Sequence, residues 1–201
     1  MSDDLDAAHK AAMQKLQAEQ REKVKKNTLE KGLLMIHTGD GKGKSSAGFG
    51  MVARSLGWGM RVGVVQFVKG DWLTGEKQFF ERFPDEVRYE VMGEGFTWDT
   101  QDRTRDIQSA EKAWAVSLEM IHDPSLDFVL LDEINIALSF DYLDVAKVKA
   151  ALLARPNDKH VCLTGRNAKS ELIEIADLVT EMRLIKHPFD QGFKAQRGVE
   201  F

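Results

Sequence analysis

The chain has 201 residues, 43% of them apolar, and a formal net charge of −4 at pH 7. This length is enough for one sizeable core, and the net negative charge gives no whole-chain argument for nucleic-acid binding. No apolar stretch is long enough to span a membrane, and the N-terminus is acidic and polar rather than a signal sequence. We therefore expect a cytoplasmic protein with no nucleic-acid or membrane partner. The single cysteine, Cys162, excludes an intrachain disulfide and lies in an apolar run typical of a buried, unreactive thiol.

Residues 2–30 are rich in Ala, Gln, Lys and Glu and contain no Gly or Pro, which predicts a mostly helical segment. Its apolar stripe is thin, so packing would hold it only weakly. We expect residues 1–30 to form a helical arm and residues 31–201 to form the main domain. The arm is either solvated, or a lid over the binding site, or a contact with a partner subunit.

A glycine-rich segment follows the first apolar run and precedes a helical pattern. It matches the phosphate-binding loop, which is Gly, four residues, then Gly-Lys-Ser/Thr, except that Thr38 stands at the first glycine position. Glycines let backbone N–H groups reach phosphate oxygens, Lys44 supplies positive charge, and the Ser45 hydroxyl can reach Mg²⁺. The alternative is a flexible glycine-rich turn. The residues expected to bind the nucleotide are Thr38, Gly39, Asp40, Gly41, Lys42, Gly43, Lys44, Ser45 and Ser46.

Apolar runs and helical patterns alternate through the rest of the chain. Near-continuous apolar runs are typical of strands covered by helices on both faces. We therefore predict an α/β fold, a P-loop (RecA-like), mostly parallel sheet of six core strands with helices on both faces. The expected strands are 32–37, 61–68, 87–92, 128–131, 160–164 and 178–183, and the expected helices are 44–56, 75–83, 104–122, 144–154 and 170–176.

Two carboxylates, Asp132 and Glu133, directly follow the apolar run at residues 128–131. In a P-loop protein, such a strand end brings a second Mg²⁺-directed group to the carboxyl edge of the sheet. We expect a metal site formed by Ser45, Asp132 and Glu133. Which carboxylate contacts the ion directly stays open.

Other polar groups fall at the same predicted edge. Gln66 and Lys69 follow the second strand, and residues 164–167, with Arg166 among them, follow the fifth. Lys69 and Arg166 are candidates for pairing with phosphate, although exposed loop cations are common. The five histidines show no zinc-ligand spacing, and we find no serine or cysteine nucleophile signature. The reaction should therefore need no side-chain nucleophile.

Phe96 and Trp98 flank Thr97 in a glycine-led loop after the third strand. They are either core residues of a short strand or an apolar wall for a flat second substrate.

Six motifs together closely resemble the P-loop type of corrinoid adenosyltransferase. The most specific are the lysine-doubled loop, Gly-Phe-Thr-Trp at 95–98 and the C-terminal Lys-Ala-Gln segment; Ser45 and Ser46 stand where that family usually has threonines. The motifs are Thr-Gly-Asp-Gly-Lys-Gly-Lys-Ser-Ser (38–46), Val-Val-Gln-Phe-Val-Lys-Gly (64–70), Gly-Phe-Thr-Trp (95–98), Leu-Leu-Asp-Glu (130–133), Leu-Thr-Gly-Arg (163–166) and Lys-His-Pro-Phe-Asp-Gln-Gly-Phe-Lys-Ala-Gln-Arg-Gly (186–198).

The resemblance implies a transferase that moves the 5′-deoxyadenosyl group of ATP to a cob(I) corrinoid and releases triphosphate, with Mg²⁺ or Mn²⁺. Cobalt is then the nucleophile, and the catalytic residues would be Lys44, Phe96 and Trp98. By resemblance, the aromatic pair lies below the corrin, excludes water and displaces the lower axial ligand of cob(II). A reduced flavoprotein as electron donor, a homodimer and an arm folded over the site are also implied.

Two other functions compete with this interpretation. A P-loop ATPase or RecA-like motor would use Glu133 to polarise water for attack on the γ-phosphate. A nucleotide-gated corrinoid-binding module would bind both ligands without forming a cobalt–carbon bond. The sequence does not distinguish an early corrinoid precursor from a complete, salvaged cobalamin as the acceptor.

Overall fold

The computed structural model describes residues 2–68, 74–92 and 102–200. Helices and strands alternate along the chain as the apolar pattern predicts. In chain order they are α1 (Ser2–Lys26), β1 (Leu34–Thr38), α2 (Lys44–Gly57), β2 (Val62–Gln66), α3 (Gly75–Phe80), β3 (Val87–Val91), α5 (Arg103–His122), β4 (Phe128–Asp132), α6 (Ile134–Ser139), α7 (Val145–Leu153), β5 (His160–Thr164), α8 (Ser170–Ile173), β6 (Leu178–Glu181) and the 3₁₀ turn η1 (Phe189–Gln191).

The six strands form one parallel sheet in the order β3-β2-β4-β5-β1-β6. β5 therefore lies between β1, which leads into the glycine-rich loop, and β4, which ends in Asp132. Because the strands are parallel, their carboxyl ends all lie at one edge of the sheet. The α/β class and the parallel sheet are as predicted, and the edge collects the loops that carry the candidate site.

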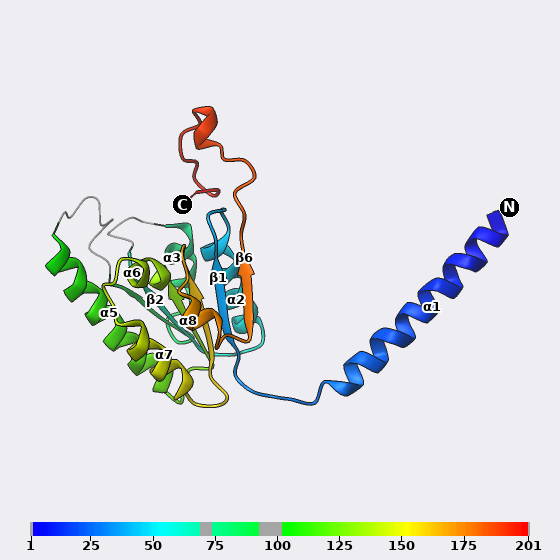
Figure 1. Cartoon of the computed structure of the whole chain (residues 1–201), viewed down its shortest axis with the longest axis horizontal. Coiled ribbons are helices and arrows are strands. Elements are labelled where there is room, and N and C mark those ends of the chain that lie inside the picture. The colour runs from blue at the N-terminus through cyan, green and yellow to red at the C-terminus, as the bar shows by residue number, and fades with distance from the viewer. Residues whose placement is uncertain (1, 69–73, 93–101, 201) are drawn as a thin grey trace. The chain divides into compact units, whose positions relative to one another are not determined.

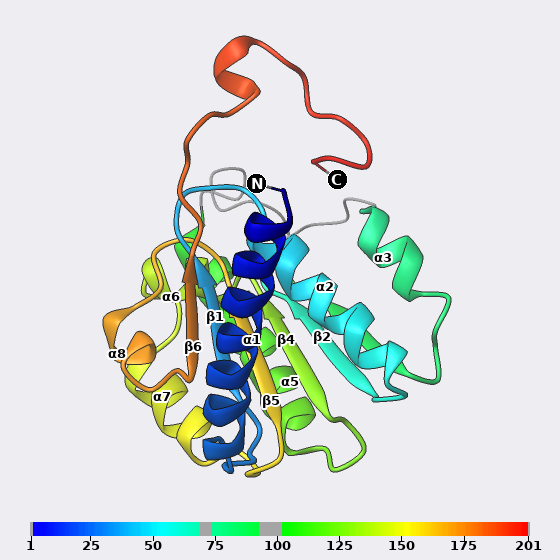
Figure 2. The same cartoon turned by 90° about the vertical axis from the view of Figure 1, so that its right-hand side faces the viewer.

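Helices cover both faces of the sheet (Figures 1 and 2). On one face, Phe49 and Val52 of α2 and Phe80 of α3 pack with Val64 and Leu130 of the sheet. On the other face, α5, α6, α7 and α8 bury a second and larger apolar cluster against the alternate residues of the same strands. Strand residues alternate between the faces, so each central strand supplies side chains to both clusters. This two-sided burial explains the near-continuous apolar runs in the sequence.

The edge strands differ from the prediction of six core strands. All four residues of β6 are exposed, because β6 lies at the end of the sheet and pairs with β1 on one side only. The short helix α6 was not predicted. It starts directly after Glu133, and four of its six residues are buried, so it shows no polar face from which a helical period could be recognised.

The chain divides into two units, residues 1–31 and 32–201, which are described separately. The first contains α1, a helix of 25 residues whose few apolar side chains stand among charged and polar ones. A helix of this composition has little apolar surface to bury. None of the helices that the structure describes is long and apolar enough to cross a membrane.

Candidate nucleotide site at the carboxyl edge of the sheet

The glycine-rich loop is shaped by main-chain contacts with the segment that follows β6. The N–H of Gly41 donates to the carbonyl of Met182 at 2.7 Å, and the N–H of Met182 donates to the carbonyl of Thr38 at 2.8 Å. A Cβ on Gly39 would lie 2.5 Å from the Met182 carbonyl oxygen, and one on Gly41 would lie 2.6 Å from that of Arg183. Real Cβ atoms do not approach a backbone oxygen so closely, so the loop needs glycine at both positions.

Thr38 stands where the usual loop pattern has glycine, and the structure gives its hydroxyl a role. Its Oγ1 accepts a hydrogen bond of 3.1 Å from the N–H of Ala168, which lies between β5 and α8. Thr38 is buried, so its side chain fastens the start of the loop to a neighbouring connection. The departure from the usual pattern therefore keeps the geometry of the loop intact.

Helix α2 begins immediately after Gly43, which has a left-handed backbone with φ of 108°. In the described part of the chain, no side chain caps this end of the helix. The first N–H groups of a helix lack intrahelical partners, and with the helix dipole they attract an anion. The loop and the uncapped end of α2 together form a cradle suited to phosphate.

Lys44 is buried at the centre of this cradle, with 7% of its surface exposed. Its Nζ donates to the carbonyl of Gly41 at 2.6 Å. Burial lowers the pKa of Lys44, the nearby charge of Glu133 opposes that shift, and the positive charge of Arg166 adds to it. A bound phosphate would compensate the buried ammonium group, so the lysine favours an anionic ligand at this point.

Asp132 is fully buried at the end of β4, and each of its oxygens accepts a hydrogen bond. The Gln66 Nε2 donates to Oδ2 at 2.8 Å, and the Thr164 Oγ1 donates to Oδ1 at 2.7 Å. Glu133 follows in a left-handed conformation with φ of 64°, and its N–H donates to Thr164 Oγ1 at 3.0 Å. Non-glycine residues in this conformation are uncommon and occur preferentially at functional sites. The Asp132 carboxylate is thus held by two donors, and the backbone turns sharply at Glu133 directly after it.

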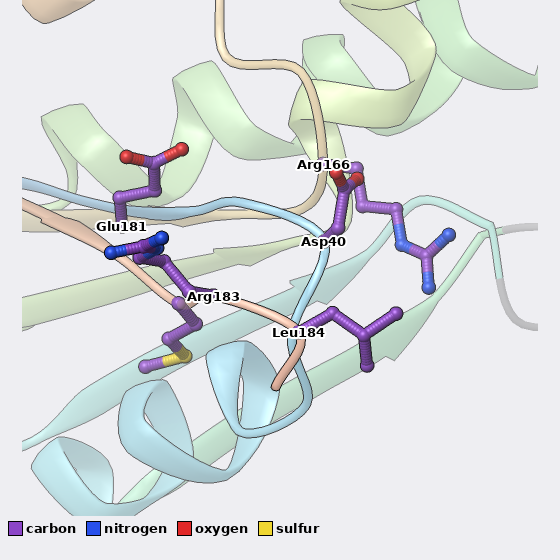
Figure 3. Close-up of a pocket in the computed structure, with 6 residues that line it drawn as sticks. Asp40, Arg166, Glu181, Arg183 and Leu184 are labelled. Carbon is purple, nitrogen blue, oxygen red and sulfur yellow. The ribbon is translucent and has the colours of Figure 1, made fainter. Parts of the chain in front are cut away.

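A pocket of about 390 Å³ opens beside the loop (Figure 3). Its walls come from the loop, from the connection after β5 and from the segment that starts at the end of β6. Positive and negative side chains share this lining, which suits a polar ligand. The lining residues are Asp40, Arg166, Glu181, Met182, Arg183 and Leu184.

The second lysine of the loop has a different partner. Lys42 forms an ion pair with Glu200, near the C-terminus, and 54% of the lysine side chain is exposed against 15% for the glutamate. In Figures 1 and 2 the segment after β6 extends beyond the carboxyl ends of the strands, the side of the sheet on which the loop lies. A carboxylate of the chain itself therefore pairs with a lysine that is expected to bind phosphate.

The structure brings most of the predicted residues to one edge of the sheet: the loop, the acidic pair and Arg166. Phe96, Trp98 and Lys69 lie outside the described residues. Sequence reasoning missed Tyr89 and the main chain of residues 181–183. A tyrosine within a strand and a contact made by the main chain belong to no sequence motif. Both contacts became evident only from the way the strands pair in the sheet.

The sequence model of one family, the ATP:corrinoid adenosyltransferases BtuR/CobO/CobP, matches residues 30–201, which include every described part of this site. The chain belongs to this family. A corrinoid adenosyltransferase of Pseudomonas aeruginosa is 55% identical over 200 residues, spanning 100% of this chain and 98% of that protein. One from Escherichia coli is 45% identical over 172 residues, spanning 86% of this chain and 87% of that protein. The arm lies almost wholly outside the family match, yet it aligns with the Pseudomonas relative.

Proposed function

We propose that this ATP:corrinoid adenosyltransferase transfers the 5′-deoxyadenosyl group of ATP to the cobalt of a cob(I) corrinoid and releases triphosphate, in adenosylcobalamin biosynthesis or salvage. Membership of the family over residues 30–201 carries this proposal. In the reaction, the electron pair of cob(I) attacks the 5′ carbon of ATP. A cobalt–carbon bond forms, the carbon–oxygen bond to triphosphate breaks, and its electrons stay on the leaving oxygen.

The task of the protein is then to align the two substrates and to stabilise charge on the leaving triphosphate. The buried ammonium of Lys44, the uncapped end of α2 and the exposed charge of Lys42 suit that task. Preorganised charges and N–H donors lower such barriers without any proton transfer by the protein. Because the reacting carbon must face the corrinoid, we further propose that the triphosphate runs through the loop in the reverse of the usual sense.

Ser45, Asp132 and Glu133 are proposed to hold Mg²⁺, with Mn²⁺ as a substitute. In the described ranges no cluster of three or more His, Cys, Asp or Glu side chains could hold an ion by itself. Two carboxylates and a hydroxyl fit an ion that completes its shell with phosphate oxygens and water, as Mg²⁺ does. When bound, the ion would neutralise charge on the triphosphate. Asp132, buried and oriented by two donors, is suited to a fixed position in that shell.

The remaining parts of the proposal rest on resemblance to the family. Phe96 and Trp98 would lie below the corrin and favour four-coordinate cob(II), which is easier to reduce, with a reduced flavoprotein supplying the electron. A homodimer, a cytoplasmic location and a lid role for residues 1–30 belong to the same proposal.

The proposal is tested by incubating the protein with ATP, Mg²⁺ and cob(I)alamin. We expect the light-sensitive absorbance of an alkylcobalamin and one triphosphate released for each one formed. Orthophosphate released without corrinoid would support the ATPase alternative instead. Nucleotide-promoted corrinoid binding without a cobalt–carbon product would support the binding module.

The aromatic pair is tested with the variants Phe96→Ala and Trp98→Ala. Losing an axial donor makes cobalt less electron-rich and raises its reduction potential. Each variant should therefore lose turnover from cob(II) with a reductant far more than turnover from prereduced cob(I). Equal losses with both substrates would contradict the proposed role.

A further inference from the structure

A row of buried polar side chains crosses four neighbouring strands just below the carboxyl edge of the sheet. The Tyr89 hydroxyl of β3 donates to Gln66 Oε1 of β2 at 2.9 Å. Gln66 Nε2 donates to Asp132 Oδ2 of β4 at 2.8 Å, and Thr164 Oγ1 of β5 donates to Asp132 Oδ1 at 2.7 Å. The row therefore approaches the carboxylate from both sides.

The chemistry of the row fixes the direction of each hydrogen bond. A glutamine amide can present either its oxygen or its nitrogen to a neighbour. Burial raises the pKa of Tyr89, as does the charge of Asp132, so the phenol keeps its proton and can donate to Gln66. With its oxygen engaged by the phenol, the amide turns its N–H₂ group to Asp132. A carboxylate can only accept hydrogen bonds, so Asp132 takes the N–H₂ end of Gln66, and the tyrosine holds the oxygen end by donating to it.

Burying these polar side chains costs folding free energy, so stabilising the sheet does not by itself explain why they are there. Gln66 is 2% exposed and Asp132 and Thr164 are 0% exposed. A buried carboxylate requires compensation by donors, and well-packed apolar residues are often as stable or more stable in such a place. What the row adds is orientation, because one donor on each oxygen restricts rotation of the carboxylate. The carboxylate is therefore held in one orientation at the end of β4.

We propose that Gln66 is a positioning residue that orients the Asp132 carboxylate for the metal ion of the MgATP complex, with Thr164 as the second donor and Tyr89 holding the oxygen end of the Gln66 amide. The inference rests on the proposed metal site and therefore on the proposed function. Partners that orient a metal-binding group typically change metal affinity or activity by about 10–100-fold when they are removed.

The test measures Mn²⁺ binding by the ATP-bound protein without corrinoid, from the electron paramagnetic resonance signal of free Mn²⁺. Gln66→Met removes one donor to Asp132 at nearly constant volume and should weaken Mn²⁺ binding by about 10-fold. Thr164→Val removes the other donor, together with the acceptor of the Glu133 N–H, and should weaken binding by at least as much. Thr164→Ser keeps the hydroxyl and should stay within about twofold of the wild type, whereas Tyr89→Phe should lose about threefold, because it acts through Gln66. The matched control is Ser117→Ala. It removes a fully buried hydroxyl that donates to the carbonyl of Ala113 within α5, and it should leave Mn²⁺ binding unchanged.

Binding of ATP without metal should be similar in all these variants, because the row contacts the carboxylate and not the loop. Equal Mn²⁺ affinity in wild type, Gln66→Met and Thr164→Val would overturn the positioning role while leaving the metal site standing. If the wild type binds no Mn²⁺ with ATP, the metal site of the proposed function fails, and the inference fails with it. If Gln66→Met does not fold, Tyr89→Phe decides the matter, because it changes the row through Gln66 and leaves both donors to Asp132 in place.

Discussion

The two walls of the candidate site are built in different ways. The phosphate loop at residues 38–46 is held by main-chain hydrogen bonds to Met182 and by the absence of Cβ atoms at Gly39 and Gly41. The acidic wall at Asp132 is held by side chains, with donors from Gln66 and Thr164 on its two oxygens. One wall therefore depends on the path of the backbone, and the other on the identity of individual polar groups.

This difference explains which substitutions each wall can accept. The loop accommodates a threonine at the first glycine position, because the Thr38 side chain turns away to accept a hydrogen bond from Ala168. It does not accommodate a Cβ where the segment after β6 passes within contact distance. The acidic wall should show the opposite behaviour, because its strands are regular and its demands lie in the hydrogen-bonding groups of the side chains.

The largest effect on activity is expected at Lys44, because its ammonium group interacts with charged side chains from both walls. Lys44→Met should lower kcat/KM for ATP by about 100–1,000-fold, the usual result of removing one charge-stabilising donor. Lys149→Met on α7, which breaks an exposed ion pair with Glu174, is the matched control and should retain full activity. A loss below about tenfold for Lys44→Met would show that the main-chain cradle alone holds the triphosphate.

The stability of the same variant, Lys44→Met, relative to the wild type should depend on pH. Because burial lowers the pKa of Lys44, folding penalises its charged form at any pH below the ordinary value of 10.5. Lys44→Met should therefore melt at a higher temperature than the wild type at pH 7. The gain should shrink as the pH approaches 10.5 and the unfolded lysine loses its proton. An equal difference in melting temperature at both pH values would argue against a charge penalty.

The substitution Gly41→Ala tests whether the path of the backbone determines the shape of the loop. A Cβ there would lie 2.6 Å from the Arg183 carbonyl oxygen, so the loop or the segment after β6 must shift. We expect a stability loss of about 1–3 kcal/mol and ATP binding weakened by about 10–100-fold. In Gly50→Ala, on α2 and with nothing within 4 Å of the new Cβ, stability should rise by about 0.5–1 kcal/mol. Calorimetry and isothermal titration measure both, and equal effects of the two substitutions would contradict the argument.

A buried polar group without donors provides a contrast to Asp132. His37 of β1 is 3% exposed, and neither of its ring nitrogens has a hydrogen-bond partner among the described residues. Burial lowers its pKa below 6.5, so the unfolded chain takes up a proton that the folded protein resists, and stability falls as the pH drops through 6.5. His37→Phe should stabilise the protein by about 1 kcal/mol at pH 8 and by more at pH 5.

His160 serves as the control for that variant, because its Nδ1 accepts a hydrogen bond of 3.1 Å from the N–H of Leu33. His160→Phe should destabilise the protein, since that N–H would lose its partner. Denaturant unfolding at pH 5 and pH 8 separates the two cases. A destabilised His37→Phe at both pH values would mean that a ligand or water satisfies the imidazole.

The smallest effect is expected at the ion pair between Lys42 and Glu200. Because 54% of the lysine side chain is exposed, the pair is partly screened and weak. Glu200→Gln should free the lysine and tighten ATP binding by about two- to fivefold at low salt, with the gain lost at high salt. Glu174→Gln disrupts an exposed pair with Lys149 and should leave ATP binding unchanged. Weaker binding in Glu200→Gln would indicate that the carboxylate helps the site instead of competing with phosphate.

Much of the fold follows from local pattern. The apolar runs at residues 62–68 and 128–131 predict buried parallel strands, and both were found within a few residues of their predicted ends. The exposed edge position of β6 and the short helix α6 were missed, because their burial depends on which strands become neighbours. A run such as residues 178–181 has the same composition in the middle of a sheet as at its edge.

The sequence by itself determined the phosphate loop, the acidic strand end and the family, because spacing along the chain is enough to specify a backbone cradle and its lysine. Tertiary structure alone decided how that cradle is supported and how the acid is oriented. Met182 lies more than 140 residues from Gly41, to which it is hydrogen-bonded, and Tyr89, Gln66 and Thr164 sit on three different strands. Gln66 and Thr164 reach Asp132, and Tyr89 reaches Gln66, only through the strand order of the sheet, because hydrogen bonds between distant segments leave no periodic pattern in the sequence.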